Sequence, residues 1–178
     1  RQMCIRDSPA TDSLNPDTDG DGFCDGPVTI IDVCEAIDAF PTDGTEWFDT
    51  DGDGIGDNSD PDVDGDGVDN EQDDFPDDPS ASKDTDGDGM PDTITGNSTS
   101  DPALIEDLDD DNDGLTDIEE DANGNGTFDD GETNSLDPDT DDDGYCDGNV
   151  TIVDVCVAVD AFPLDSSEWF DTDGDGIG

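Results

Sequence analysis

Aspartate residues recur at alternate positions in eight short stretches of the chain, and this spacing is suited to holding a cation. Each stretch has Asp or Asn at positions 1, 3 and 5 and Gly at position 6. Carboxylates about 4 Å apart repel by about 1 kcal/mol in water and by more near a protein surface. We name each loop by the number of its first residue. The loops begin at Asp17, Asp49, Asp62, Asp84, Asp109, Asp121, Asp139 and Asp171.

A bound Ca²⁺ ion would turn this repulsion into attraction. Ca²⁺ takes about 6–8 oxygen ligands, and a twelve-residue loop supplies them from positions 1, 3, 5, 7, 9 and 12. Position 7 acts through its main-chain carbonyl and position 9 often through a water, while Gly at position 6 permits the sharp turn. Mg²⁺ prefers fewer carboxylates, and Zn²⁺ or copper would require His or thiolate clusters. We therefore predict multiple Ca²⁺ sites.

The predicted ligands follow from these positions, beginning with the eight first residues. Position 3 supplies Asp19, Asp51, Asp64, Asp86, Asp111, Asn123, Asp141 and Asp173. Position 5 supplies Asp21, Asp53, Asp66, Asp88, Asp113, Asn125, Asp143 and Asp175. Position 7 supplies the carbonyls of Phe23, Ile55, Val68, Met90, Leu115, Thr127 and Tyr145. Position 9 supplies Asp25, Asp57, Asn70, Asp92, Asp117, Asp129 and Asp147. Position 12 supplies Asp60, Asp73, Glu120 and Glu132, and is Val28, Thr95 or Val150 elsewhere.

The composition leaves little material for an apolar core around these loops. The 178 residues include 56 Asp or Glu, three Lys or Arg and no His, which gives a formal net charge of −53. Such a chain is expected to be mostly irregular, a calcium-organised repeat array of Asp-rich loops with a few short helices and little conventional core. The charge excludes nucleic acid and anionic membrane as partners, and no apolar run is long enough to span a bilayer. The lack of His and of basic partners for Ser or Cys predicts no enzymatic activity.

The chain divides into a repeated segment and a middle array. Residues 1–8, "RQMCIRDS", look like translated sequencing adapter, and we interpret them as non-native. Residues 11–56 and 133–178 are identical at 35 of 46 positions, so we expect a longer array in which the second copy is truncated. Residues 57–132 carry loops 62, 84, 109 and 121, with a polar, flexible stretch at 93–101.

Four cysteines occupy equivalent places in the two long repeats. Four cysteines allow three disulfide connectivities. We favour Cys24–Cys34 and Cys146–Cys156, because each repeat then closes on itself. This pairing would indicate an oxidising compartment, whereas buried free thiols would not.

Each cysteine pair links position 8 of a loop to one of two apolar segments, "VTIIDVCEAIDAFP" and "VTIVDVCVAVDAFP". The spacing of apolar residues predicts a short helix over 29–40, although its Val and Ile content also permits a β-structure. Trp47 and Phe48 follow, and we expect them to pack on that helix as a small core. An aromatic platform for a ligand is the alternative.

The loops as a group resemble thrombospondin type 3 repeats. The resemblance is carried by "DTDGDGIGDNSD" at 49–60 and "DVDGDGVDNEQD" at 62–73, and residues 111–144 look like the microbial version. It implies an extracellular or cell-surface spacer, such as a stalk or an adhesion-associated segment, that wraps around Ca²⁺ between neighbouring domains or surface proteins. The cysteines here lie elsewhere than in the vertebrate repeats, so that disulfide scheme does not carry over.

Two other functions fit part of the sequence. A dockerin-like module would use paired calcium loops and helices for calcium-dependent docking to a protein partner. A disordered acidic polyanion would bind many cations weakly and without folding. The number of loops and the apolar residue at position 7 rather than 8 favour the spacer.

Overall fold

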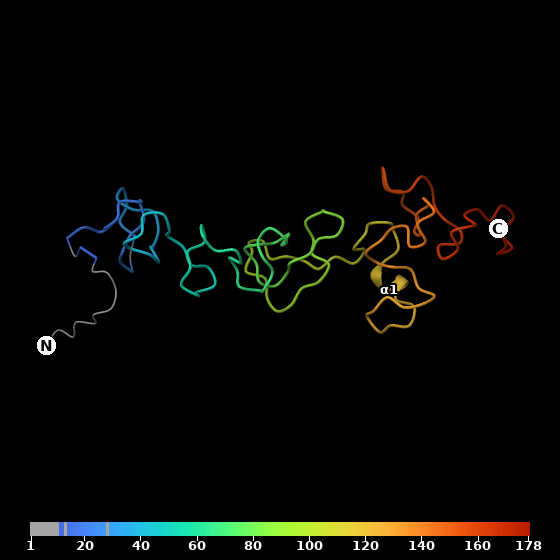
Figure 1. The fold of residues 1–178 in the computed structure, drawn as a ribbon, viewed down its shortest axis with the longest axis horizontal. Helices are drawn as coiled ribbons and strands as arrows, with labels where there is room; N and C mark the ends of the chain where they lie inside the picture. Colours follow the sequence, from blue (N-terminus) through green and yellow to red (C-terminus); the bar gives the residue numbers. More distant parts are fainter. Residues whose placement is uncertain (1–10, 13, 28) are drawn as a thin grey trace. The chain divides into compact units, whose positions relative to one another are not determined.

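The computed structural model describes residues 11–12, 14–27 and 29–178. The chain divides into two units, of which the first ends at Pro79 and the second begins at Ser80. The one helix in these ranges, α1, is Asp117–Glu120 (Figure 1). Isolated parallel bridges join Cys24 to Ile37 and Cys146 to Val159, and the described ranges form no sheet. The predicted irregular architecture of Asp-rich loops with little conventional core is therefore confirmed. The suspected adapter, residues 1–8, lies outside the described residues.

Each loop is built from turns in which an Asp side chain accepts hydrogen bonds from the following backbone. In loop 49, the N–H of Gly52 donates to Asp49 Oδ1 at 2.9 Å, and the N–H of Ile55 donates to Asp53 Oδ1 at 2.7 Å. Gly54, at position 6, has φ +94°, a conformation that residues with a Cβ rarely adopt. The sequence pattern of Asp and Gly therefore specifies the path of the loop.

A second set of bonds closes six of the loops at their base. In loop 49, the N–H of Asp57 at position 9 donates to the carbonyl of Phe48, the residue before the loop, at 3.0 Å. The N–H and hydroxyl of Thr50 donate to the two carboxylate oxygens of Asp57, both at 2.8 Å. The same backbone bond from position 9 recurs in loops 17, 62, 84, 109 and 139.

The helix expected over 29–40 does not form, so that prediction is wrong. The N–H groups of Val33 and Cys34 both donate to Ile30, which gives a single turn, and Asp32 at φ +65° ends it. The chain then runs back along loop 17, where Glu35 donates to the carbonyl of Gly22 at 2.9 Å. The disulfide and these cross-chain bonds use the backbone groups that a helix would need. The isolated bridge to Ile37 is nearer to the β alternative.

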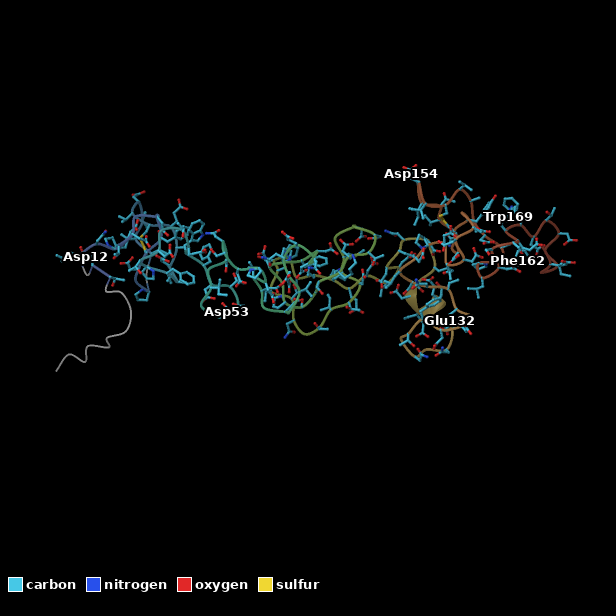
Figure 2. The ribbon with its side chains drawn as sticks, in the orientation of Figure 1. Asp12, Asp53, Glu132, Asp154, Phe162 and Trp169 are labelled. Atoms are coloured by element: carbon cyan, nitrogen blue, oxygen red, sulfur yellow. A yellow bond between two sulfur atoms is a disulfide. The ribbon has the colours of Figure 1, made fainter. Side chains whose placement is uncertain are left out.

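The second long repeat departs from the helical pattern in the same way. Val155 and Cys156 donate to Ile152, and Asp154 has φ +69°. Asp154 lies exposed at the tip of this turn (Figure 2). Because the same turn forms in both copies, it is a property of the repeated sequence.

The aromatic residues pack on the aromatic side chain at position 7 of an Asp-rich loop, and not on a helix. Trp47 stacks on Phe23, at position 7 of loop 17, with ring centroids 5.2 Å apart, and Phe48 meets Phe23 edge-on at 5.3 Å. Tyr145 repeats these contacts with Trp169 at 5.4 Å and with Phe170 at 5.3 Å. These clusters tie each loop to the segment that leads into the next one.

Acidic side chains fill most of the buried positions in both units. Among the described apolar side chains, those of the four disulfide cysteines, Val63, Ala81 and Pro91 are the ones buried. The carboxylates of Asp64, Asp111, Asp113 and Glu120 are more deeply buried than most apolar side chains of the chain. Large apolar side chains such as Ile31 remain exposed, at 86%. No helix in the described ranges has the length and apolar composition required to cross a membrane.

Candidate metal centres

The carboxylates at positions 1, 3 and 5 converge within individual loops. In each such group, one oxygen from every residue lies within 4.8 Å of the others. Asp53 is one of these residues and is labelled in Figure 2. The groups include Asp17, Asp19 and Asp21; Asp49, Asp51 and Asp53; Asp62, Asp64 and Asp66; Asp84, Asp86 and Asp88; and Asp109, Asp111 and Asp113. The structure thus brings together the ligands that the sequence predicts for these loops.

Backbone N–H groups hold the carboxylates at positions 3 and 5 of loop 17 by one oxygen each, whereas Asp17 at position 1 is held by both of its oxygens. In loop 17, Asp21 Oδ1 accepts the N–H of Phe23 at 2.8 Å, and Asp17 accepts the N–H groups of Gly20 and Gly22. The remaining oxygens Asp19 Oδ2 and Asp21 Oδ2 are buried without a hydrogen-bond partner. A buried acceptor that lacks a donor is costly, so this oxygen pair calls for a proton or a cation.

The same unpartnered oxygens occur in other loops. Loop 109 has the largest number of unpartnered oxygens, which include atoms of Asp109 and Asp111 and both carboxylate oxygens of Glu120. In loop 62 the unpartnered atoms are Asp64 Oδ2 and Asp73 Oδ2. Carboxylates accept hydrogen bonds and cannot donate them when ionised, so they cannot satisfy one another. Hard oxygen donors grouped in this way fit a hard cation such as Ca²⁺.

Burial raises the pKa of several of these carboxyl groups. The pKa of Asp111 is raised to about 8, that of Glu120 to about 7 and that of Asp64 to about 6. The main cause is loss of solvent, and the charges of neighbouring carboxylates add to it. These three carboxyl groups therefore favour the arrival of positive charge, whether as protons or as a metal ion.

Position 9 has a contact that the sequence did not predict. Both oxygens of Asp25 accept from Thr18 at position 2, one from its N–H at 2.9 Å and the other from its hydroxyl. Asp57 and Asp92 make the same pair of contacts with Thr50 and Thr85. These residues clasp the loop, and their role as ligands stays a prediction. The carbonyl ligands at position 7 also stay a prediction.

In loops 49 and 109, position 12 is placed by a bond to the carbonyl at position 8. The N–H of Asp60 donates to Gly56 at 2.9 Å, and that of Glu120 donates to Thr116 at 3.1 Å. Glu120 is the last residue of α1, which the sequence did not predict. Glu119 Oε2 accepts from both the N–H and the hydroxyl of Thr116, and this arrangement starts the helical turn. The turn directs Glu120, 2% exposed, into loop 109.

Three further aspartates make the same bond and were missed from the sequence. Asp38, Asp107 and Asp160 donate their N–H to position 8 of loops 17, 84 and 139, at 2.9, 2.9 and 2.7 Å. All three side chains are buried. They lie beyond the twelve-residue window, so a search restricted to the loop could not find them. The equivalent positions of Asp38 and Asp160 in the two long repeats are the signal that was available.

The cysteines form the two local disulfides that the sequence favoured. Cys24 is bonded to Cys34 and Cys146 to Cys156, each with a Cα–Cα distance of 5.3 Å. Cys24 and Cys146 occupy position 8, so each disulfide begins at the residue whose carbonyl holds Asp38 or Asp160. The free-thiol alternative is therefore not what the structure contains.

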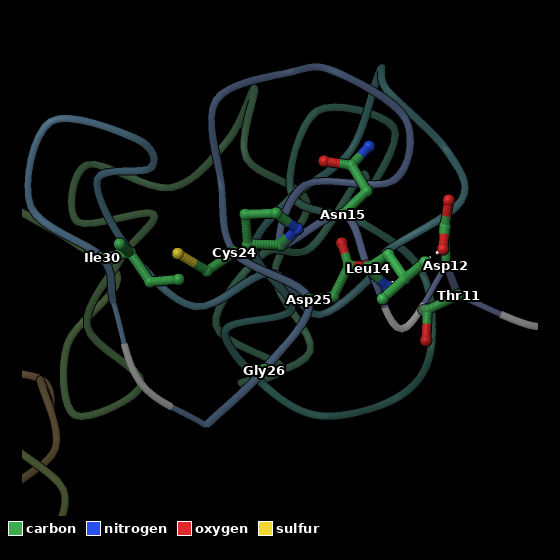
Figure 3. A pocket seen from close by; sticks show the side chains of 9 residues that line it. Thr11, Asp12, Leu14, Asn15, Cys24, Asp25, Gly26 and Ile30 are labelled. Atoms are coloured by element: carbon green, nitrogen blue, oxygen red, sulfur yellow. Dashed lines mark hydrogen bonds between the residues drawn. The ribbon is translucent and has the colours of Figure 1, made fainter.

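An open hollow of about 440 Å³ lies beside loop 17 (Figure 3). Its two carboxylates already serve in turns: Asp12 Oδ1 accepts the N–H of Leu14 at 3.0 Å, and Asp25 is held by Thr18. The side chains drawn around it include Thr11, Asp12, Leu14, Asn15, Cys24, Asp25 and Ile30.

Comparisons with known proteins give no match. No family model matches the chain, and neither a curated protein nor a solved structure matches it.

Proposed function

We propose that this chain is an extracellular calcium-binding spacer, of the kind formed by thrombospondin type 3 repeats, that becomes ordered when Ca²⁺ binds. Its role is structural: it would hold neighbouring domains or surface partners apart, as a stalk or an adhesion-associated segment does. Calcium ions are its ligands. The two disulfides are compatible with an oxidising, extracellular environment.

One observation carries the proposal. Buried carboxylate oxygens without hydrogen-bond partners occur together in loops 17, 62, 109 and 139, as in Asp19 with Asp21 and in Asp141 with Asp143. A solvated acidic tail would not bury carboxylates beside one another, because each pair costs both desolvation and repulsion. A dication in each loop offsets both costs.

Calcium binding and folding are then one event. Without the ion, the charges of a loop repel and the chain expands, since there is little apolar core to oppose them. With the ion, positions 1, 3, 5 and 12 become a ligand shell and the loop is fixed. Extracellular sites of this kind have dissociation constants of about 10⁻⁴–10⁻³ M.

The test is a Ca²⁺ titration of residues 9–178 in the oxidised form. Far-UV circular dichroism and small-angle scattering are recorded from chelator to ~10 mM Ca²⁺, above the expected range of dissociation constants, with Mg²⁺ as the matched control. A cooperative contraction and spectral change with Ca²⁺ alone supports the proposal.

A gradual change that is equal for the two ions would mean charge screening by a polyanion, and the proposal would fall. The dockerin-like alternative is not favoured, because a loop-plus-helix unit requires a helix over 29–40 and this segment forms a single turn instead.

A further inference from the structure

Loops 17 and 139 have no acidic residue at position 12, where the ligand that completes a calcium loop belongs. Their twelfth residues are Val28, outside the described residues, and Val150. Positions 1, 3, 5, 7 and 9 with one oxygen each still supply fewer than the roughly 6–8 that Ca²⁺ takes. Both loops nevertheless bury unpartnered carboxylate oxygens at positions 3 and 5. A further carboxylate must therefore come from outside the loop if these sites are to be complete.

Asp38 has the position and the free atom that loop 17 requires. Its side chain is 5% exposed, and its Oδ1 accepts the N–H of Phe40 at 2.7 Å. Its Oδ2 is buried without a partner, as are Asp19 Oδ2 and Asp21 Oδ2. The charges of Asp21 and Asp19 act on the Asp38 carboxyl group, so the three groups lie in one acidic cluster.

The second long repeat has the same arrangement of burial, hydrogen bond and unpartnered oxygen. Asp160 is 6% exposed, and its Oδ1 accepts the N–H of Phe162 at 2.7 Å. Its Oδ2 is buried and unpartnered, together with Asp141 Oδ2 and Asp143 Oδ2 of loop 139. Two copies that differ at 11 of their 46 residues keep the same returning carboxylate.

The disulfide of each repeat holds the returning segment against the loop. In the first repeat the Cys24–Cys34 bond is followed by the bond from the Cys24 N–H to Ala36, at 2.7 Å, and by the bridge to Ile37. The next residue is Asp38, whose own N–H donates to the carbonyl of Cys24. Asp60 and Glu120 use the same bond to position 8 when they close their own loops.

We propose that Asp38 and Asp160 supply the closing calcium ligand of loops 17 and 139, so that each site is composite and its second half is held in place by a disulfide. This inference rests on the proposed calcium-binding function and extends it. It makes the oxidation state of two cysteine pairs a determinant of affinity at loops 17 and 139, while loops 49 and 62 depend on their own Asp60 and Asp73.

Tb³⁺ luminescence sensitised by tryptophan tests the proposal in the full chain. Tb³⁺ replaces Ca²⁺ at oxygen sites, and Trp47 stacks on Phe23 of loop 17. A Trp169→Phe background leaves Trp47 as the only tryptophan, and excitation at the red edge of its band selects it. Asp60→Asn identifies any signal from loop 49, which begins two residues after Trp47. Calcium competition then gives the affinity of loop 17.

Asp38→Asn is expected to weaken Ca²⁺ binding at loop 17 at least about tenfold, since even outer-shell changes cost that much at metal sites. Asn keeps an oxygen for the Phe40 N–H and removes the charge. Glu35→Gln is the matched control, because it removes the same charge from an exposed side chain three residues away. It is expected to leave the affinity unchanged. Reduction of the disulfide should resemble Asp38→Asn.

The outcomes separate the two proposals. If the parent protein binds neither Tb³⁺ nor Ca²⁺, the proposed function fails. If the parent binds and Asp38→Asn binds equally well, the composite site is wrong and the calcium function stands. Mass spectrometry of the Cys24–Cys34 bond and the fluorescence of Trp47 show that the variant has folded. A loss of binding in both Asp38→Asn and Glu35→Gln would point to overall charge and would also overturn the composite site.

Discussion

Loops 109 and 121 follow one another directly in the chain, share the same spacing, and differ in how their oxygens are satisfied. In loop 109, Asp111 and Glu120 are buried, and oxygens of both lack partners. In loop 121, the side chain of Asn125 donates to Asp129 at 2.7 Å, and Glu132 accepts the backbone N–H groups of Asn123 and Asp129. The carboxylates of the first loop call for a proton or a cation, whereas those of the second are already hydrogen-bonded.

The comparison shows that two loops with the same spacing of Asp or Asn and Gly can differ in how many carboxylate oxygens lack a hydrogen-bond partner. The Asn side chains at positions 3 and 5 have N–H groups, which donate hydrogen bonds to neighbouring carboxylate oxygens. The pKa of Asp129 is lowered chiefly by the side chain of Asn125, and that of Asp121 by the N–H of Gly126. We therefore expect affinity to follow the number of unpartnered carboxylate oxygens rather than the match to the motif.

The largest expected effect is a separation of the two loops during calcium removal. Chelation should release loop 109 into an open ensemble and leave the hydrogen-bonded turn of loop 121 largely intact. The measurement is a Ca²⁺ titration followed by the amide resonances of Gly114 and Gly126, the position-6 residues. Gly114 is expected to shift at lower Ca²⁺ than Gly126. Equal midpoints for the two amides would remove the basis of the comparison.

The closing residues of the two loops should respond unequally to loss of charge. Glu120→Gln is expected to reduce Ca²⁺ affinity at loop 109 at least about tenfold, because this carboxylate is 2% exposed and lies near the charges of Asp113 and Asp117. Glu132→Gln, the matched change in loop 121, should have a smaller effect, because Glu132 is held by backbone N–H groups. Isothermal titration calorimetry of the two variants makes the comparison, and equal losses would contradict it.

Loop 121 should gain affinity when its two amides become carboxylates. The double change Asn123→Asp and Asn125→Asp gives it the ligand charges of loop 109, and calcium loops are tuned by ligand charge. We expect roughly a tenfold rise in affinity, with a less stable metal-free loop because the bond from Asn125 to Asp129 is lost. Calorimetry measures the affinity, and an unchanged value would show that the surrounding chain sets it.

The smallest expected effect is an opposite pH dependence of the two loops without metal. The pKa of Asp111 is raised to about 8 in the folded loop, so the folded form binds protons more tightly than the unfolded chain. Loop 109 should then lose stability as the pH rises from about 4 to about 8.

Loop 121 should behave in the reverse sense, since the folded pKa values of Asp121 and Asp129 are lowered. Its stability is present above their ordinary value of 3.8 and is lost as the pH falls through the lowered values. Hydrogen exchange at Leu115 and Thr127, measured in chelator from below pH 3.8 to about pH 8, checks both signs. Parallel profiles would show that the buried and exposed carboxylates do not differ as described.

The sequence predicted the loops well because their geometry is local. Each turn depends on an Asp side chain and a backbone N–H two to five residues away, as in the bond from Gly54 to Asp49. The loop path, the converging triplets and the two disulfides could therefore be anticipated from spacing and duplication alone.

The elements that the sequence did not predict depend on contacts between distant segments. The apolar spacing over 29–40 suggested a helix, but the bond from Glu35 to Gly22 and the disulfide outweighed that preference. Asp38 was missed because its role depends on this return of the chain. The short helix α1 was missed because one loop position, Thr116, starts it within a calcium loop.

The burial of carboxylates in place of apolar side chains has a thermal consequence. The heat capacity of unfolding arises mainly from newly exposed apolar surface, while polar surface contributes with the opposite sign. A fold whose buried positions are filled by residues such as Asp113 and Glu120 exposes little apolar surface when it opens. Its stability curve is therefore flat with temperature, and the chain would stay ordered in the cold, where apolar cores weaken. Under the proposed function, the concentration of Ca²⁺ rather than temperature would set the boundary between the ordered and the disordered chain.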